Sequence, residues 1–87
     1  RKLAEGLTKL KQSQKAKLQE VLSTRDQARR ALAVARKEKG KFERLLAGGG
    51  VSRDEVELKR SEYLSARANF RVAEAKLGEL EFNLSQE

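Results

Sequence analysis

The 87-residue sequence contains no cysteine, histidine, proline, methionine or tryptophan, and its only aromatic side chains are three Phe and one Tyr. Without cysteine there is no disulfide framework, and without cysteine and histidine the usual zinc and copper ligands are absent. The same absences remove the most common general base and the thiol nucleophile. We therefore expect no enzyme, no cofactor and no metal site. The longest apolar run, residues 31–35, is too short to span a membrane.

The residues that are abundant form helices readily. Ala, Leu, Glu, Lys, Arg and Gln dominate, 38% of the chain is charged, and 20 basic against 13 acidic residues give a net charge of +7. With no proline to interrupt it, this composition predicts long helices. Because the chain begins at Arg1 rather than at an initiator methionine, we expect it to be a piece of a larger protein.

One glycine cluster divides the chain. Residues 48–50 are all glycine, and glycine is favoured where a helix ends in a left-handed conformation. Ser52 and Glu55 follow at the spacing of a capping box, and Val51 and Val56 at that of a hydrophobic staple. The sequence therefore predicts one domain made of a first helix over about 2–46, a tip at 47–52 and a second helix over about 53–87.

Apolar residues repeat every seven positions in both predicted helices. In the second helix the series is Val56, Tyr63, Phe70, Leu77 and Leu84, accompanied by Ala66, Ala73 and Leu80. In the first helix the series is Leu7, Gln14, Val21, Ala28, Ala35 and Phe42, with Gln14 as its polar exception, accompanied by Leu18, Leu32 and Leu46. Such a repeat, sustained over several heptads, is typical of a coiled-coil seam.

The short tip requires the two helices to run antiparallel. Folding about Gly49 places large side chains opposite small ones, in the layers Phe42 with Val56, Ala35 with Tyr63, Leu32 with Ala66, Ala28 with Phe70, Arg25 with Ala73, Val21 with Leu77 and Leu18 with Leu80. Lys39 falls opposite Lys59, so we expect both to splay or snorkel. Residues 1–46 carry a net charge of +9 and residues 53–87 carry −2, so the arms attract. The predicted fold is an all-α, antiparallel two-helix coiled-coil hairpin.

The tip resembles a known motif. Residues 41–55 resemble the hairpin tip of the membrane fusion proteins, the periplasmic adaptors of hemolysin D-like secretion systems and multidrug efflux pumps. The tip motif of that family is Arg, three residues, Leu, six residues, Ser. Leu45 and Ser52 match it in type and spacing, Lys41 stands at the Arg position, and Arg44 is one turn away as a possible substitute. Residues 63–68, 73–77 and 79–85 are also similar to the descending helix of such adaptors.

The resemblance implies a function. It implies that the hairpin bridges an inner-membrane transporter to a TolC-type outer-membrane channel in tripartite efflux or type I secretion. The channel would dock at Lys41, Arg44, Leu45 and Ser52, while the transporter would be reached through domains outside this chain. It also implies a periplasmic, inner-membrane-associated protein that assembles as a homo-oligomer, a hexamer.

Other interpretations stay open at this point. Capping alone explains Ser52, and a solvated charge is the ordinary role for Lys41, whereas an apolar Leu45 beside the seam suggests a contact. The basic stretch from Arg29 to Lys41 suggests an alternative, a coiled-coil arm that binds nucleic acid such as tRNA. No recognition motif or aromatic stacking platform accompanies that stretch, so we do not expect nucleic acid as the partner. A plain structural spacer is the third possibility.

Overall fold

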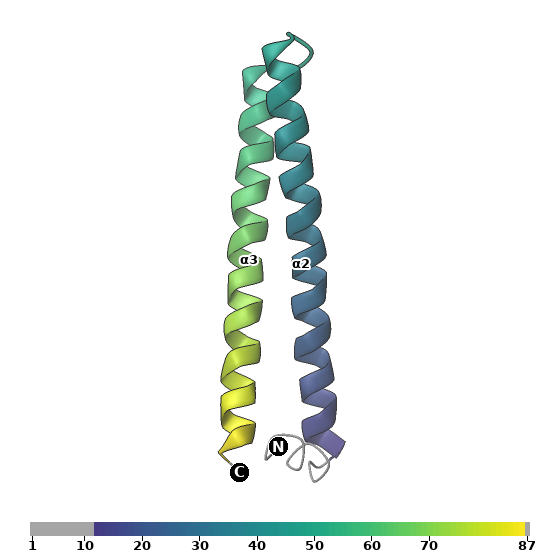
Figure 1. The fold of residues 1–87 in the computed structure, drawn as a ribbon, viewed down its shortest axis with the longest axis vertical. Coiled ribbons are helices and arrows are strands. Elements are labelled where there is room, and N and C mark those ends of the chain that lie inside the picture. The colour runs from purple at the N-terminus through teal and green to yellow at the C-terminus, as the bar shows by residue number, and fades with distance from the viewer. Residues whose placement is uncertain (1–11, 87) are drawn as a thin grey trace.

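A computed structural model describes residues 12–86, which form two long helices joined by a tight turn (Figure 1). Helix α2 spans Gln12–Ala47 and helix α3 spans Arg53–Ser85. They lie side by side and antiparallel in a body of 59 × 21 × 14 Å, so the all-α hairpin is confirmed. The turn and the start of the second helix lie where the sequence predicts them. The predicted start of the first helix, near residue 2, lies outside the described residues.

Burial follows the heptad repeat in both helices. Val56, Ala73 and Leu77 are buried, with Val56 only 1% exposed, and the other described apolar seam residues are half-buried. Two helices can cover each other on one side only, so the rest of each surface faces solvent. Phe70 is among the half-buried residues, which means that the hairpin has a narrow apolar seam rather than an enclosed core.

Ion pairs between the helices agree with the predicted register. Lys59 Nζ lies 3.9 Å from Glu38 Oε1, and Arg25 Nη1 lies 3.8 Å from Glu74 Oε2. Arg25 occupies a seam position, and its guanidinium also donates to the carboxylate of Asp26 at 3.0 Å. Carboxylates at the edge of the seam therefore neutralise a charge that the heptad pattern alone would leave among apolar side chains.

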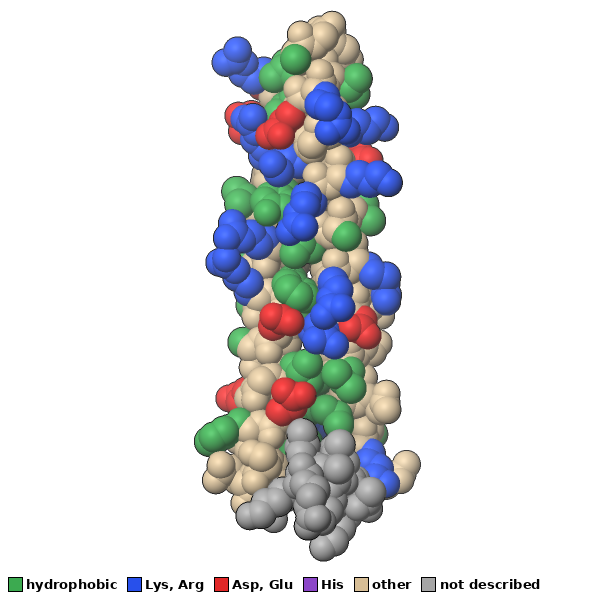
Figure 2. All heavy atoms as spheres, viewed as in Figure 1, with side chains coloured by type: hydrophobic (Ala, Val, Ile, Leu, Met, Phe, Trp, Pro, Cys, Tyr) green, Lys and Arg blue, Asp and Glu red, His purple; other side chains and the backbone are tan. Residues whose placement is uncertain are grey.

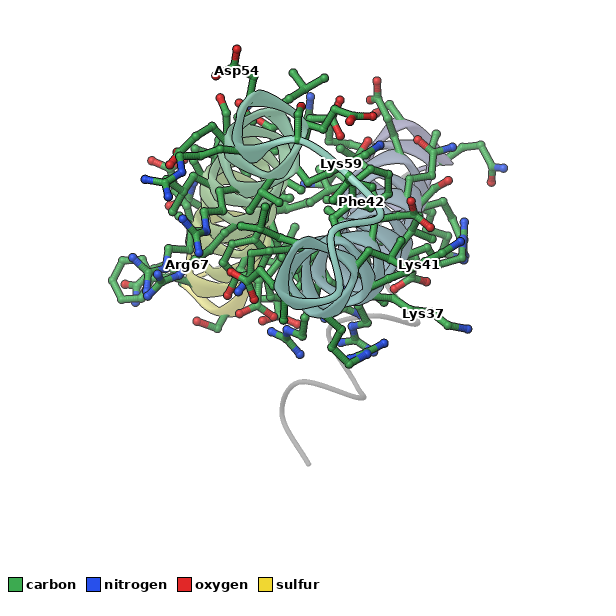
Figure 3. The ribbon with its side chains drawn as sticks, turned by 90° about the horizontal axis from the view of Figure 1, so that it is seen from above. Lys37, Lys41, Phe42, Asp54, Lys59 and Arg67 are labelled. Atoms are coloured by element: carbon green, nitrogen blue, oxygen red, sulfur yellow. The ribbon has the colours of Figure 1, made fainter. Side chains whose placement is uncertain are left out.

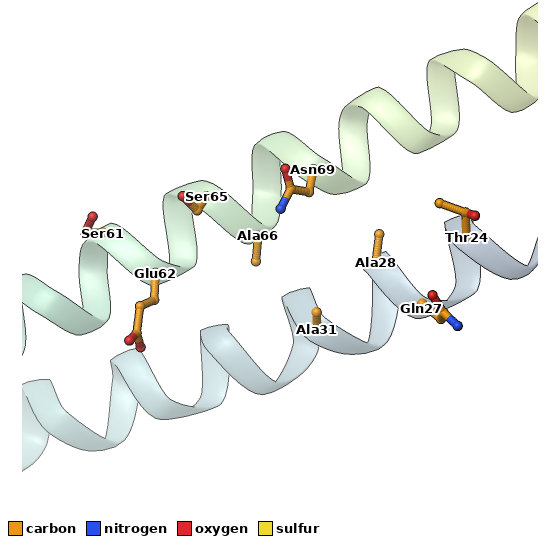
Figure 4. A pocket seen from close by; sticks show the side chains of 9 residues that line it. All are labelled: Thr24, Gln27, Ala28, Ala31, Ser61, Glu62, Ser65, Ala66 and Asn69. Carbon is orange, nitrogen blue, oxygen red and sulfur yellow. The ribbon is translucent and has the colours of Figure 1, made fainter. Parts of the chain in front are cut away.

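The middle of the hairpin is less tightly packed than the alternation of large and small residues predicts. A groove of about 530 Å³ opens along one side of the seam. Its lining is Thr24, Gln27, Ala28, Ala31, Ser61, Glu62, Ser65, Ala66 and Asn69 (Figure 4). Ala28 and Ala66 point into the space between the helices, where two methyl groups cannot fill the interhelical gap.

Candidate functional site

The candidate site is the tip, and its turn is built by backbone hydrogen bonds. Gly50 N–H donates to the carbonyl of Leu45 at 2.8 Å, and Gly49 N–H donates to the carbonyl of Leu46 at 3.0 Å. Gly49 has φ 81°, in the left-handed region. This pair of bonds around a left-handed glycine is the Schellman motif, which satisfies the last carbonyls of a helix. The glycine cluster thus ends α2 as the sequence predicts.

Ser52 begins α3 through a complete capping box. Its Oγ accepts from the Glu55 N–H at 3.1 Å, and its own N–H donates to Glu55 Oε1 at 2.8 Å. The hydrogen bond from the Ser52 backbone lowers the pKa of Glu55 below its ordinary value of 4.5. The Ser52 side chain is exposed, and a side-chain hydrogen bond from Ser52 also lowers the pKa of Glu55. The residue therefore caps the helix from a position that a partner can reach.

Leu45 supplies an apolar surface beside the turn. Its side chain is 39% exposed, whereas its neighbour Leu46 fills the seam. A Cβ placed on Gly50 would stand 3.6 Å from Leu45 Cδ2, so the leucine rests against the glycine backbone. The turn therefore packs against one side of Leu45 and leaves its other side accessible.

Two exposed basic residues approach the turn from α2. Lys41 lies four residues before Leu45 and so shares its face of the helix, and it points outward (Figure 3). The Arg44 side chain extends back toward Gly40, one turn earlier on α2. A Cβ placed on Gly40 would stand 3.5 Å from Arg44 Nη1. Neither residue forms an ion pair with another described residue. Lys41, Arg44 and Leu45 all lie within the last two turns of α2, and Ser52 lies on the other side of the glycine turn.

A cluster just below the tip was not predicted from the sequence. Lys59 Nζ lies 5.0 Å from the centre of the Phe42 ring, and Lys39 Nζ lies 5.1 Å from that of Tyr63. Figure 3 shows Lys59 and Phe42 together between the two helices. The sequence feature that could have predicted this cluster is the spacing on each helix, where an aromatic residue follows a seam lysine by three or four positions.

An ion pair on the flank of the seam completes this cluster. Arg60 Nε donates to Glu43 Oε2 at 2.9 Å, and Lys39 approaches the other oxygen of Glu43 at 3.6 Å. The hydrogen bond from Arg60 lowers the pKa of Glu43, and the same bond raises the pKa of Arg60. The helices are therefore joined by polar contacts beside the exposed tip residues, since Glu43 lies between Lys41 and Arg44 on α2.

The exposed tip residues offer apolar, charged and hydrogen-bonding contacts. Within residues 12–86 no three His, Cys, Asp or Glu side chains gather where they could hold a metal ion. Neither α2 nor α3 is long and apolar enough to cross a membrane. The tip presents one leucine, two cations and a hydroxyl donor, a set that fits recognition of another protein.

Comparison with known proteins returned no match, neither to family models nor to curated proteins nor to solved structures.

Proposed function

We propose that this chain is the α-helical hairpin of a periplasmic adaptor, which bridges an inner-membrane transporter to a TolC-type outer-membrane channel. The tip residues Lys41, Arg44, Leu45 and Ser52 dock the channel. The observation that carries the proposal is the exposure of Leu45 at the end of a long hairpin, beside a turn whose backbone hydrogen bonds are internally satisfied.

The geometry suits docking because the tip is already ordered. The Schellman turn and the capping box fix both helix ends, so a partner would not have to order the loop on binding. Leu45 offers the apolar contact, Lys41 and Arg44 offer charge, and the Ser52 hydroxyl offers a directional hydrogen bond. The channel side of the contact would be helical tips of complementary polarity.

A single tip is a small surface, well below the ~1,000 Å² expected of a stable interface. Assembly of the full-length protein as a hexamer would compensate, because six linked tips bind with a high effective concentration after the first has docked. The proposal therefore includes a homo-oligomer, a periplasmic location, and a transporter contact through domains outside this chain.

The test is a single substitution in the full-length protein that contains this hairpin. Leu45→Asp should abolish transport and cross-linking to the channel while leaving the helicity of the 87-residue chain nearly unchanged. Phe82→Asp is the matched control, since Phe82 is a 62% exposed apolar residue near the other end of α3. Normal export by the Leu45→Asp protein would show that the docking assignment is wrong.

Nucleic-acid binding remains the alternative prediction. The rings of Phe42 and Tyr63 lie beneath lysines and Phe70 is half-buried, which leaves Phe82 as the exposed aromatic side chain of the described residues. That is a poor platform for stacking bases. Binding of tRNA to the 87-residue chain with micromolar or tighter affinity, falling steeply with salt, would favour this alternative over the adaptor.

A further inference from the structure

The middle of the hairpin contains basic residues and no acidic ones. No Asp or Glu occurs between Asp26 and Glu38 on α2, or between Glu62 and Glu74 on α3. Six cations lie in these two stretches, and we call them the mid-hairpin basic patch: Arg29, Arg30, Arg36, Lys37, Arg67 and Arg71. All six are exposed. In Figure 2 part of the middle of both helices shows blue side chains without red ones, red side chains appear above and below this part, and further blue side chains lie near the tip.

The four acids that bound the patch already have other partners. Asp26 and Glu74 both pair with Arg25, at 3.0 and 3.8 Å. Glu38 and Glu62 both pair with Lys59, at 3.9 and 3.5 Å. Two seam cations therefore use the nearest carboxylates, and no patch residue forms an ion pair with another described residue.

The patch also breaks a pattern of opposite charges along one flank. Arg60 pairs with Glu43 on that flank. One heptad further from the tip, Arg67 replaces Arg60 on α3 and Arg36 replaces Glu43 on α2. The antiparallel register thus sets two arginines beside each other, and like charges at such positions destabilise a coiled coil. The free hairpin carries a repulsion that an anionic partner would relieve.

The spacing and surroundings of the patch favour a protein partner over nucleic acid. Arg29 and Arg36 repeat every seven residues, as do Arg30 and Lys37, a rise of about 10.5 Å that matches heptad-spaced acids on another helix. Phosphates of a duplex recur about every 3.4 Å along each strand.

Large exposed apolar residues occur in the same two stretches as the cations. Leu64 and Val72, beside Arg67 and Arg71, are 58% and 54% exposed, and Val34 on α2 is 62% exposed. Apolar side chains mixed with arginine are typical of protein interfaces. We propose that the mid-hairpin basic patch docks an acidic helical surface of a partner protein, one that presents Asp or Glu at heptad spacing next to apolar side chains. This surface is separate from the tip.

The probe for this proposal is a soluble designed helical peptide with glutamates at heptad spacing beside leucines, labelled for fluorescence anisotropy with the 87-residue chain. We expect saturable binding that weakens about tenfold in Arg36→Gln/Arg67→Gln. The control Lys15→Gln/Lys76→Gln loses the same charge from exposed positions outside the patch and should change affinity less than about twofold. A peptide of the same composition with scrambled glutamate spacing should bind more weakly than the probe.

A second variant separates lost binding from lost folding. Arg67→Glu places a carboxylate beside Arg36, so it should raise the melting temperature while removing probe binding. Leu45→Asp should leave probe binding unchanged, which distinguishes failure of this proposal from failure of tip docking. Equal losses in the patch and control variants, unchanged binding by Arg67→Glu, or patch-dependent binding of a 30-base-pair RNA duplex that is tighter than that of the peptide would overturn the proposal.

Discussion

The ammonium group of Lys59 on α3 lies 5.0 Å from the centre of the Phe42 ring on α2, and Lys39 of α2 lies 5.1 Å from the Tyr63 ring on α3. Each lysine crosses the seam to the aromatic residue that follows the other lysine. Two like charges that face each other are thereby separated, and each ammonium gains a ring face. Glu43, which pairs with Lys39 and Arg60, adds negative charge to the same region.

This arrangement predicts a measurable coupling between Lys59 and Phe42. Lys59→Gln and Phe42→Leu should each lower the free energy of unfolding, and the double variant should lose about 0.5–1 kcal/mol less than the two losses combined. Urea unfolding of the four proteins gives the coupling directly. Strict additivity would mean that the lysine and the ring do not interact.

The sequence predicted that Lys39 and Lys59 would face each other across the seam, but it did not predict where their side chains would lie. The heptad pattern places Lys39 opposite Lys59 and implies that both must leave the seam. Which way each turns depends on the rotamer and on the position of a ring across the interface, and a one-dimensional pattern does not contain either. The ion pairs of Arg25 with Asp26 and Glu74 escaped prediction for the same reason.

Burial at the tip end of the seam predicts a contrast between two valines. Val56 is 1% exposed and Val72 is 54% exposed on the same helix. Val56→Ala should lower the free energy of unfolding by about 2 kcal/mol, because it removes two methyl groups from the seam. Val72→Ala should leave it within about 0.5 kcal/mol of the parent. Equal effects in urea unfolding would contradict the burial pattern.

The glycines predict stability changes of opposite sign. Gly49 has φ 81°, so Gly49→Ala should destabilise the hairpin by about 1–2 kcal/mol. Gly78 lies within α3 with open space around its missing Cβ, so Gly78→Ala should stabilise by about 0.5–1 kcal/mol. Thermal melts of both variants check this. A stabilising Gly49→Ala would show that the turn is not held in the left-handed conformation.

The capping box predicts a loss in Ser52→Ala. Removing the Oγ that accepts from Glu55 N–H should cost about 1 kcal/mol of unfolding free energy. Ser52→Asn, which can also cap, should recover much of the loss. If Ser52→Ala melts at the parent temperature, the hydroxyl does not stabilise the helix in solution.

The same box predicts the direction of an acid effect. Because the folded-state pKa of Glu55 is lowered, its stabilisation is fully present above the ordinary value of 4.5 and is lost as the pH falls through the lower folded value. The hydrogen bond from Arg60 also lowers the folded-state pKa of Glu43, so the stabilisation by Glu43 is lost at low pH in the same way. Glu55→Gln keeps an acceptor but does not titrate, so its melting temperature should fall less steeply between about pH 5 and pH 3. An unchanged slope would contradict the assignment.

The candidate site was predictable in its parts. The helix end, the cap and the off-seam position of Leu45 follow from residue type and spacing, and the structure places all three accordingly. The support of Leu45 by Gly50 and the contacts of Lys59 with Phe42 and of Lys39 with Tyr63 are contacts across the turn or between helices. Sequence spacing along one helix does not determine such contacts.

The most direct test of the central claim is site-specific cross-linking from the tip. Since this chain has no cysteine, Arg53→Cys gives one attachment point within the hairpin for a photo-cross-linker, at the exposed start of α3, and Gln19→Cys gives one at an exposed position near the other end of the hairpin, each in a full-length protein with any other cysteine replaced. With a TolC-type channel and the full-length protein, we predict cross-links from position 53 to the periplasmic helical tips of the channel and none from position 19. Absence of cross-links from position 53, or equal cross-linking from both positions, would contradict docking through the tip.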